Sequence, residues 1–454
     1  MTGLALSSCC HDPGTAEEQG SAAESETSSE SESATESTSE TSTSGTATSE
    51  TGPECGSSED CSVDAPICEG GSCVACDEAQ TLTCASERPD TPVCRVEDGQ
   101  CVECSSADTS ACAVEQPICV ANLCSGCRLH ADCPASGCNM ESGACMPTDR
   151  VWYVDDDVVA SGDGSEAAPY DSVLEVLPNI DIGESGTVIV VTKLNHTDTI
   201  DVQNYRTLAV VDRTVDGWFS GNGEPAMVLG NHAKVFIDSF VLRSFTDTAV
   251  YCTLSDLWIR DALVRGVNDT ISATSCNLHV ESSTLAASGG WTLFLDNTSL
   301  ELTNSFVAGA NDYNTIELDP DSEATIVYST IVGGYFDSAA IHCGLGATGA
   351  GSSVRNSILA SFANTPEVGE CPDLSVTDSA LEGSLGDNLS LGGVQATWFE
   401  DYNGGDFHLT PMSPPTLAGA GVWREGDPRV DIDGDPRPAV AGSVDSVGAD
   451  LRPR

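Results

Sequence analysis

From residue 235 onward, the chain repeats a short run in which apolar and polar residues alternate. The apolar residues take every second position, as Val235/Ile237 and Leu257/Ile259 do in the first two runs. Seven runs align, with starts 21 to 28 residues apart, at 235–245, 257–267, 278–288, 300–310, 324–334, 352–362 and 374–384. Alternation predicts β-strands with one buried face, and a fixed period of this length predicts a solenoid.

A second apolar-rich run precedes most of the later repeats, at 249–254, 270–275, 291–297, 315–319 and 339–345. Two or three short strands per repeat, without helical periodicity, predict a parallel β-helix rather than a leucine-rich or helical array. Small polar residues recur after the main runs, at Ser239, Asp261, Ser282, Asn304, Asn356 and Asp378, and Tyr328 interrupts this column. We expect a turn here, in which stacked side chains satisfy backbone groups.

The two ends of this region carry further signals. Residues 152–177 contain a β-rich run, a Gly/Asp-rich loop and an apolar stretch suited to a short capping helix. Residues 431–450 form a Gly/Asp-rich closing segment. Together with the repeat period, these segments resemble the right-handed parallel β-helix, or pectate-lyase-like, superfamily. The closing segment resembles that of surface β-helix proteins of the choice-of-anchor type. The resemblance implies an all-β, right-handed parallel β-helix over 148–454. Because this scaffold hosts lyases, hydrolases, epimerases and adhesins, it does not fix the activity.

Cysteines dominate residues 55–147, where they form four consecutive units. The units are Cys55, Cys61, Cys68 and Cys73; Cys76, Cys84, Cys94 and Cys101; Cys104, Cys112, Cys119 and Cys124; and Cys127, Cys133, Cys138 and Cys145. Units this small cannot build a hydrophobic core, so we expect two disulfides inside each. Zinc binding and redox activity of the Cys-x-x-Cys pairs are the alternatives. Zinc is disfavoured because the N-terminal segment indicates a location outside the cytosol, and redox activity is disfavoured because no βαβ pattern surrounds the pairs. The region resembles cysteine-rich stalk modules of bacterial surface lipoproteins.

Four later cysteines fall in the β-helix region. Cys252 and Cys276 are 24 residues apart, and Cys343 and Cys371 are 28 residues apart. Each separation is about one repeat, so we expect each pair to bridge adjacent turns.

The N-terminus suggests export. Leu4 to Cys9 read LALSSC, which resembles the lipobox of bacterial lipoproteins, with Cys9 as the lipid-bearing residue and 1–8 as the remnant of a signal peptide that begins upstream. Residues 9–54 are rich in Ser, Thr and Glu and lack large apolar residues, so we expect a disordered spacer. The sequence therefore predicts a lipid-anchored, extracytoplasmic protein.

Charge narrows the set of partners. The chain has 17 Lys and Arg against 71 Asp and Glu, a formal net charge of −54. This surface repels phosphate backbones, which excludes nucleic acid as a partner.

Candidate chemistry is sparse. The motifs of the lyases, polygalacturonases and epimerases of the superfamily are not found. Asp431, Asp433 and Asp435 alternate as in a calcium loop but lack the bidentate Glu, because Ser443 stands at loop position 12. Calcium is therefore the only cofactor considered, and a polar turn is the alternative.

Outward positions of the aligned strands supply the binding candidates. Phe236, Trp258, His279 and Glu301 form one column, and Asp238, Arg260 and Glu281 form the next. An aromatic strip beside charged groups suits sugar rings. The alternative is packing under a neighbouring loop, with the charges paired between turns. We expect a monomer that recognises or adheres to extracellular polysaccharide or another surface ligand. The other hypotheses are a polysaccharide lyase or glycoside hydrolase with a diverged site, and a purely structural envelope protein.

Overall fold

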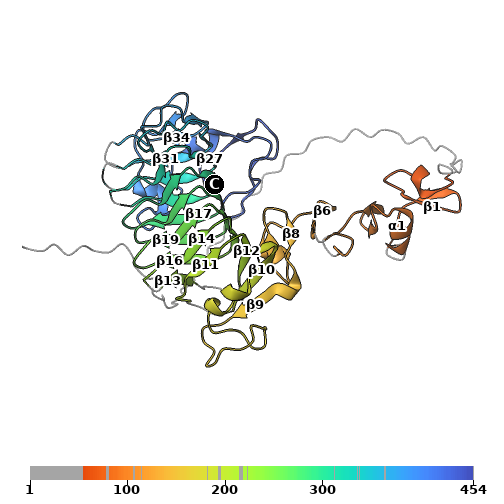
Figure 1. Cartoon of the computed structure of the whole chain (residues 1–454). Coiled ribbons are helices and arrows are strands. Elements are labelled where there is room, and N and C mark those ends of the chain that lie inside the picture. Colours follow the sequence, from red (N-terminus) through yellow and green to blue (C-terminus); the bar gives the residue numbers. More distant parts are fainter. Residues whose placement is uncertain are drawn as a thin grey trace, which may run out of the picture. The chain divides into compact units, whose positions relative to one another are not determined.

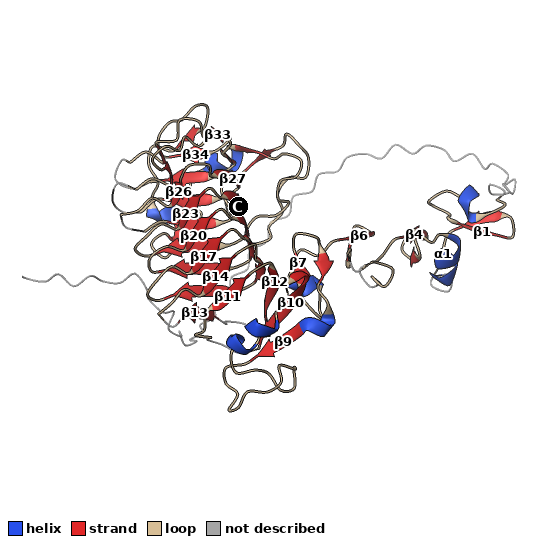
Figure 2. Cartoon of the chain, in the orientation of Figure 1, coloured by secondary structure: helices blue, strands red, loops and turns tan. Residues whose placement is uncertain are grey.

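The computed structural model describes residues 55–452, apart from 78–80, 106–107, 114, 181, 193–195, 214–217, 222, 311, 335, 337 and 362–364. Its elements are almost all strands, as predicted (Figure 2). The chain divides into two compact units, with the boundary between Ala111 and Cys112. Among the described residues, no helix is long and apolar enough to cross a membrane. Cys9 and the predicted spacer lie outside the described residues.

Disulfides hold the first unit together. Its elements are the 3-10 helix η1 (Ser58–Asp60), β1 (Ile67–Glu69), β2 (Ser72–Val74), α1 (Thr81–Glu87), β3 (Val93–Arg95) and β4 (Gln100–Val102). The bonds are Cys55–Cys68, Cys61–Cys73, Cys76–Cys94 and Cys84–Cys101. Each of these two repeats thus joins its first cysteine to its third and its second to its fourth, and a short antiparallel hairpin places the third and fourth cysteines side by side.

The second unit begins with the rest of the cysteine-rich region. It contains β5 (Ile118–Val120), β6 (Leu123–Ser125), η3 (His130–Asp132), β7 (Cys138–Asn139), β8 (Ala144–Cys145) and η4 (Thr148–Arg150). The bonds Cys112–Cys124, Cys127–Cys138 and Cys133–Cys145 follow the same pattern. Cys104 and Cys119 are also disulfide-bonded.

A parallel β-helix built from three sheets makes up the rest of the second unit (Figure 1). The ten-stranded sheet contains β9 (Val151–Val154), β10 (Gly183–Val191), β12 (Arg206–Asp212), β15 (Lys234–Asp238), β18 (Asp256–Arg260), β21 (Asn277–Glu281), β24 (Ser299–Thr303), β27 (Glu323–Val327), β30 (Ser353–Arg355) and β33 (Ser375–Thr377). The eight-stranded sheet contains β11 (Ile200–Gln203), β14 (Met227–Gly230), β17 (Val250–Thr253), β20 (Ile271–Thr274), β23 (Leu293–Asp296), β26 (Ile316–Leu318), β29 (Ile341–Cys343) and β32 (Val368–Gly369). The nine-stranded sheet contains β13 (Trp218–Gly221), β16 (Val241–Ser244), β19 (Leu263–Gly266), β22 (Thr284–Ala287), β25 (Phe306–Ala308), β28 (Thr330–Val332), β31 (Ile358–Ala360), β34 (Ala380–Leu381) and β35 (Leu389–Ser390).

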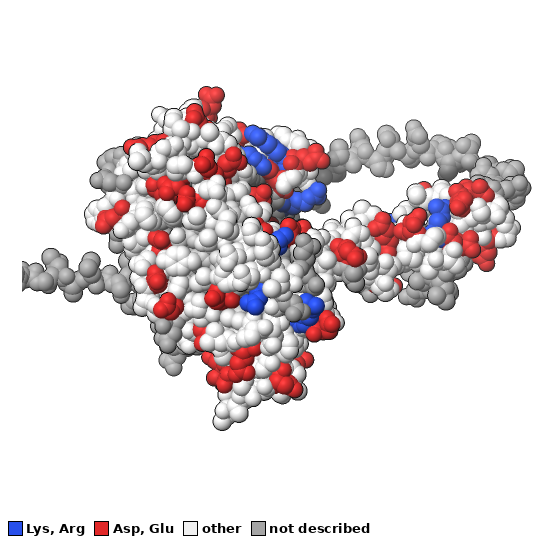
Figure 3. All heavy atoms as spheres, viewed as in Figure 1, with Lys and Arg blue, Asp and Glu red and all other residues white. Residues whose placement is uncertain are grey.

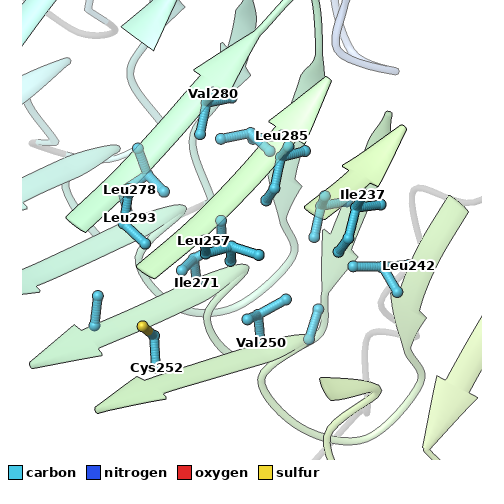
Figure 4. Close-up of a cluster of buried hydrophobic side chains, with 14 of the residues drawn as sticks. Ile237, Leu242, Val250, Cys252, Leu257, Ile271, Leu278, Val280, Leu285 and Leu293 are labelled. Carbon is cyan, nitrogen blue, oxygen red and sulfur yellow. The ribbon is translucent and has the colours of Figure 1, made fainter. Parts of the chain in front are cut away.

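The apolar side chains at every second position of each strand fill the interior of the β-helix. Leu257 and Ile259 of β18 are buried and stack on Leu278 and Val280 of β21 one turn later, as aligned from sequence (Figure 4). One apolar cluster runs through the turns from Val154 to Leu381. At the first turn, η5 (Val173–Glu175) and η6 (Leu177–Asn179) close this core, where the sequence predicts a short capping helix.

The corner between the ten- and nine-stranded sheets uses left-handed backbone at the predicted polar column. Its residues, Ser239, Asp261, Ser282, Asn304, Tyr328, Asn356 and Asp378, all have φ between 47° and 55°. Tyr328 therefore keeps the backbone of the column, although its ring is buried under the Arg437 guanidinium, 4.1 Å from the ring centroid.

The hydrogen bonds that join neighbouring turns at this corner are made by the residue that directly follows each member of the polar column, and this residue is often serine. The backbone N–H groups of Ser283, Ser305, Ser329 and Ser357 donate to the hydroxyl of the serine one turn later, at 3.1–3.4 Å. The hydroxyl groups of these same four serines each donate to the carbonyl two residues earlier. The rung-to-rung pairing expected at the polar column is thus made mainly by this serine ladder.

The fourth cysteine-rich repeat packs on the first turns of the β-helix. Met146 joins Val188, Ala209 and Phe236 in a buried cluster on the outer face of the ten-stranded sheet. The fold's contacts therefore do not separate at residues 147/148, the boundary expected from sequence, because this repeat shares an apolar interface with the strands.

The C-terminal segment covers part of another face. Its elements are η7 (Ala396–Trp398), β36 (Phe399–Asp401), β37 (Asp406–Leu409), η8 (Pro415–Gly419), β38 (Gly421–Val422) and β39 (Val444–Asp445). Phe399 and Phe407 pack on Phe306, Ile358 and other outward residues of the nine-stranded sheet. Two of the three faces of the β-helix are thus partly occupied by the chain itself.

Candidate functional site

The aromatic strip predicted on the ten-stranded sheet is in register but only partly exposed. Phe236, Trp258, His279 and Glu301 pair in sequence across β15, β18, β21 and β24. Phe236, however, is fully buried beneath the fourth repeat. Our expectation of an exposed ring at this position is therefore wrong, since packing under a neighbouring segment occurs there.

Both faces of the Trp258 indole are occupied. The Phe236 ring lies 4.7 Å away on one side, and the His279 ring lies 4.8 Å away and nearly parallel, at 6°, on the other. His279 Nδ1 is in turn 2.8 Å from Glu301 Oε2. A sugar ring stacks on an open aromatic face, and Trp258 does not offer one.

Residues of the charged column beside the strip form hydrogen bonds to the fourth cysteine-rich repeat. The carboxylate of Asp238, which is buried, accepts the His130 backbone N–H at 2.8 Å, and the His130 ring is 3.2 Å from the Phe236 carbonyl. Arg260 pairs with Glu281 at 2.9 Å and also donates to the carbonyl of Arg128 at 3.4 Å. The three charges therefore do not form one continuous ladder: Arg260 pairs with Glu281, while Asp238 caps a backbone group.

The acidic loop near the C-terminus has the contacts of a polar turn. Asp431 Oδ1 accepts the backbone N–H groups of Asp433 and Asp435, and Asp431 Oδ2 accepts that of Leu451. Among the described residues, the groups of three potential metal ligands with atoms within 4.8 Å of one another consist only of disulfide-bonded cysteines. The contacts of Asp431 thus favour the polar turn over a calcium loop.

The outer face of the eight-stranded sheet is a second candidate, and it faces the viewer in Figure 2. Its strands contain no Lys or Arg. Tyr251, Ser272, Phe294, Glu317 and His342 stand in register on consecutive strands and point outward. Acidic groups are scattered over this side of the molecule (Figure 3).

The polar half of this face centres on Glu317. Its carboxylate receives the Asn314 side-chain N–H at 2.9 Å and lies 3.0 Å from His342 Nδ1. Glu317 is buried, while His342 remains partly exposed. Burial, followed by the charges of Glu317 and Asp296, raises the pKa of Asp319 beside it.

Gly344 lets the two carboxylates approach each other. A Cβ at this position would stand 2.0 Å from Asp319 Oδ1 and 3.2 Å from Glu317 Oε1. The two distances together place these oxygens no more than about 5 Å apart. The absent side chain leaves room for both, which is a common role of glycine at a strand end.

The aromatic half lies one turn earlier. Phe294 is the register partner of Glu317, and the Trp291 ring packs between Phe294, at 5.0 Å, and Tyr313, at 5.1 Å. Tyr313 is 40% exposed and Tyr251, on β17, is 37% exposed. Partly exposed rings beside hydrogen-bonding carboxylates are the arrangement that we expected on the other sheet.

Sequence reasoning missed this face, although the signal was present. The runs 291–297, 315–319 and 339–345 alternate like the main runs, so Phe294, Glu317 and His342 fall at outward positions. Applying the alternation argument to these second runs finds all three residues.

A pocket of about 430 Å³ lies where the C-terminal segment meets the polar corner. His408 Nε2 is 3.2 Å from Asp433 Oδ1 there, and Nδ1 contacts Asp406. Although desolvation lowers it, these carboxylates raise the pKa of His408. Desolvation raises the pKa of Asp261, in the pocket wall, to about 6, with help from the charge of Asp238.

Comparisons with known proteins find two similarities. Residues 42–151 match a family of unknown function (DUF8331). No curated protein matches the chain. Among solved structures, the chain is similar to the crystal structure of pectate lyase Pel9A, at 13% identity and a TM-score of 0.41, over 68% of this chain and 98% of that one. At this level of similarity, no activity carries over.

Proposed function

We propose that the protein recognises an extracellular polysaccharide on the outer face of its eight-stranded sheet. The observation that carries this is the pairing of an aromatic cluster, Trp291, Phe294 and Tyr313, with the hydrogen-bonded Glu317–His342 pair one turn away. Rings supply contact area for sugar faces, and carboxylates and imidazoles accept and donate hydrogen bonds to hydroxyls. Turns about 4.8 Å apart give a flat surface along which an extended chain can lie.

The acidic character of this face narrows the class of polysaccharide. Glu317, Asp319 and Asp296 lie close together, with no Lys or Arg on the strands of this sheet. Polyuronates would be repelled, because like charges across an interface cost affinity. The ligand is therefore a neutral or amino-sugar polymer.

Tyr313→Ala and Phe294→Ala should each weaken binding to such a polymer by about tenfold, since truncating an aromatic contact costs more than about 1 kcal/mol. Tyr205→Ala is the matched control, because Tyr205 is 60% exposed but stacks on His232 at a different corner. Affinity measured on a glycan array and by calorimetry tests this. Equal affinity in all variants would contradict the proposal, as would loss of binding only in the control.

A second candidate function, glycoside hydrolysis, is favoured by the separation of the Glu317 and Asp319 oxygens. The upper bound of about 5 Å lies below the roughly 6.5–9.5 Å of inverting glycosidases, so this pair would fit a retaining mechanism better. A reducing-end assay on the glycans that bind separates the two functions. Turnover that Glu317→Gln abolishes while binding persists indicates an enzyme, and binding without turnover leaves recognition alone.

We also propose that Cys9 carries a lipid and that the Ser/Thr/Glu-rich spacer presents the folded units outside the cell. Support comes from the lipobox-like LALSSC and from the oxidised cysteines of the repeats, which are typical of exported proteins. When the gene is expressed with the coding sequence upstream of Met1, the protein should enter the detergent phase, and Cys9→Ser should move it to the aqueous phase. Unchanged partitioning of Cys9→Ser would contradict the proposal of a lipid anchor.

A further inference from the structure

Two arginines stand side by side on the outer face of the nine-stranded sheet. Arg243 of β16 and Arg265 of β19 are register partners, so their Cα atoms are about 4.8 Å apart. Only 17 of the 454 residues are Lys or Arg, against 71 Asp and Glu. Adjacent like charges in so acidic a chain are unexpected and call for a physical reason.

Arg243 lacks a partner for its charge. Within the described part of the chain, its guanidinium makes no hydrogen bond or ion pair, and its Nε is buried without an acceptor. Arg265 donates from Nη2 to the Gly404 carbonyl at 3.3 Å. A buried donor without an acceptor destabilises the folded chain, and the repulsion between two neighbouring guanidiniums adds to that cost.

The side chains around the two arginines are partly exposed. Trp218, on the neighbouring strand β13, and Phe245, which follows β16, contact each other edge to face at 5.5 Å, and Phe245 is 58% exposed. Trp218, Arg243 and Phe245 occupy outward positions on the same face. On the other side, the C-terminal hairpin approaches through Gly404. The arginines thus lie between an aromatic edge and a backbone wall.

We propose that Arg243 and Arg265 bind an oxyanion, a carboxylate or a sulfate. Guanidinium groups present paired N–H donors that match such an anion, and a bound anion satisfies Arg243 Nε while screening the two cations from each other. The anion is either a free ion or a substituent of an acidic saccharide whose ring contacts Trp218 and Phe245. This site is independent of the acidic face of the eight-stranded sheet.

The test compares thermal unfolding in sodium sulfate and in sodium chloride at equal ionic strength, for the full chain and for Arg243→Gln. Because sulfate stabilises most proteins by exclusion from the surface, the informative quantity is the difference between the two proteins. Sulfate should raise the Tm of the wild type by more, and Arg243→Gln should weaken sulfate binding, measured by calorimetry, by about tenfold or more. Without the anion, the variant should be at least as stable as the wild type, because one repelling charge is gone.

Arg206→Gln is the matched control, since Arg206 also has a buried Nε without an acceptor but has no arginine beside it. It should respond to sulfate like the wild type. Equal sulfate responses in wild type and Arg243→Gln overturn the proposal, as does an anion-free loss of stability confined to Arg243→Gln. Dextran sulfate, with unsulfated dextran as the blank, identifies the source of the anion. Tighter binding of dextran sulfate than of free sulfate, per sulfate group, indicates an acidic saccharide. Equal binding per sulfate group indicates a free ion.

Discussion

Phe236→Ala should destabilise the β-helix unit by about 3–5 kcal/mol, the usual cost of removing a buried phenylalanine. The ring is fully buried between the ten-stranded sheet and the fourth cysteine-rich repeat, with Met146 and Val188 in the same cluster. Truncation leaves a cavity in that interface and removes the ring that supports Trp258. Urea unfolding followed by tryptophan fluorescence measures the change.

Limited proteolysis locates the loss of stability in Phe236→Ala, because cleavage should begin in the fourth repeat rather than in later turns of the β-helix. Phe336→Ala is the control, since that ring is 64% exposed and should change stability by less than about 0.5 kcal/mol. A loss below about 1 kcal/mol for Phe236→Ala would mean that the repeat is not packed on the strands.

The C-terminal segment should be held more tightly at pH 5 than at pH 8. Burial and the charge of Asp431 raise the pKa of Asp450 to about 7, and the carboxylates around His408 raise its pKa as well. The folded state therefore retains protons that the unfolded chain has released, so stability falls as the pH rises from about 4 to above 7. At about 1.4 kcal/mol per pH unit between the two pKa values, Asp450 accounts for a loss on the order of 2–4 kcal/mol.

Thermal unfolding at intervals from pH 5 to pH 8 checks this slope. Asp450→Asn should flatten it, because the amide keeps an oxygen for the Leu409 N–H, which is 2.5 Å from the carboxylate, and cannot ionise. Asp387→Asn, at an exposed position, should retain the wild-type slope. Equal stability at both pH values, or an unchanged slope in Asp450→Asn, would contradict the prediction.

The strand register could be predicted from sequence because burial leaves a period-two signal in every turn. The alignment of Val235, Leu257, Leu278 and Leu300 is the register of the ten-stranded sheet. The pairs Cys252–Cys276 and Cys343–Cys371, expected from spacing of about one repeat, are the bonds found in the structure. Local alternation and repeat length carry this information without knowledge of the rest of the chain.

Exposure could not be predicted in the same way. Period two distinguishes inward from outward positions, but an outward residue is exposed only if nothing else covers it. Phe236 and Asp238 are covered by residues 90 or more positions earlier, through contacts such as His130 to Asp238. No local pattern records so distant a contact. The open face with Glu317 and His342 was missed for a different reason, because alternation was applied to only one strand of each turn.

The two disulfides of the β-helix change what a protease can do to it. Each bond joins neighbouring turns, Cys252 to Cys276 and Cys343 to Cys371, so the backbone between its cysteines forms a closed covalent ring. A single cut inside either ring opens a loop but releases no fragment. The turns on both sides stay joined, and the strands remain paired along their length. A cut inside one of these rings and the loss of the folded unit are therefore separate events.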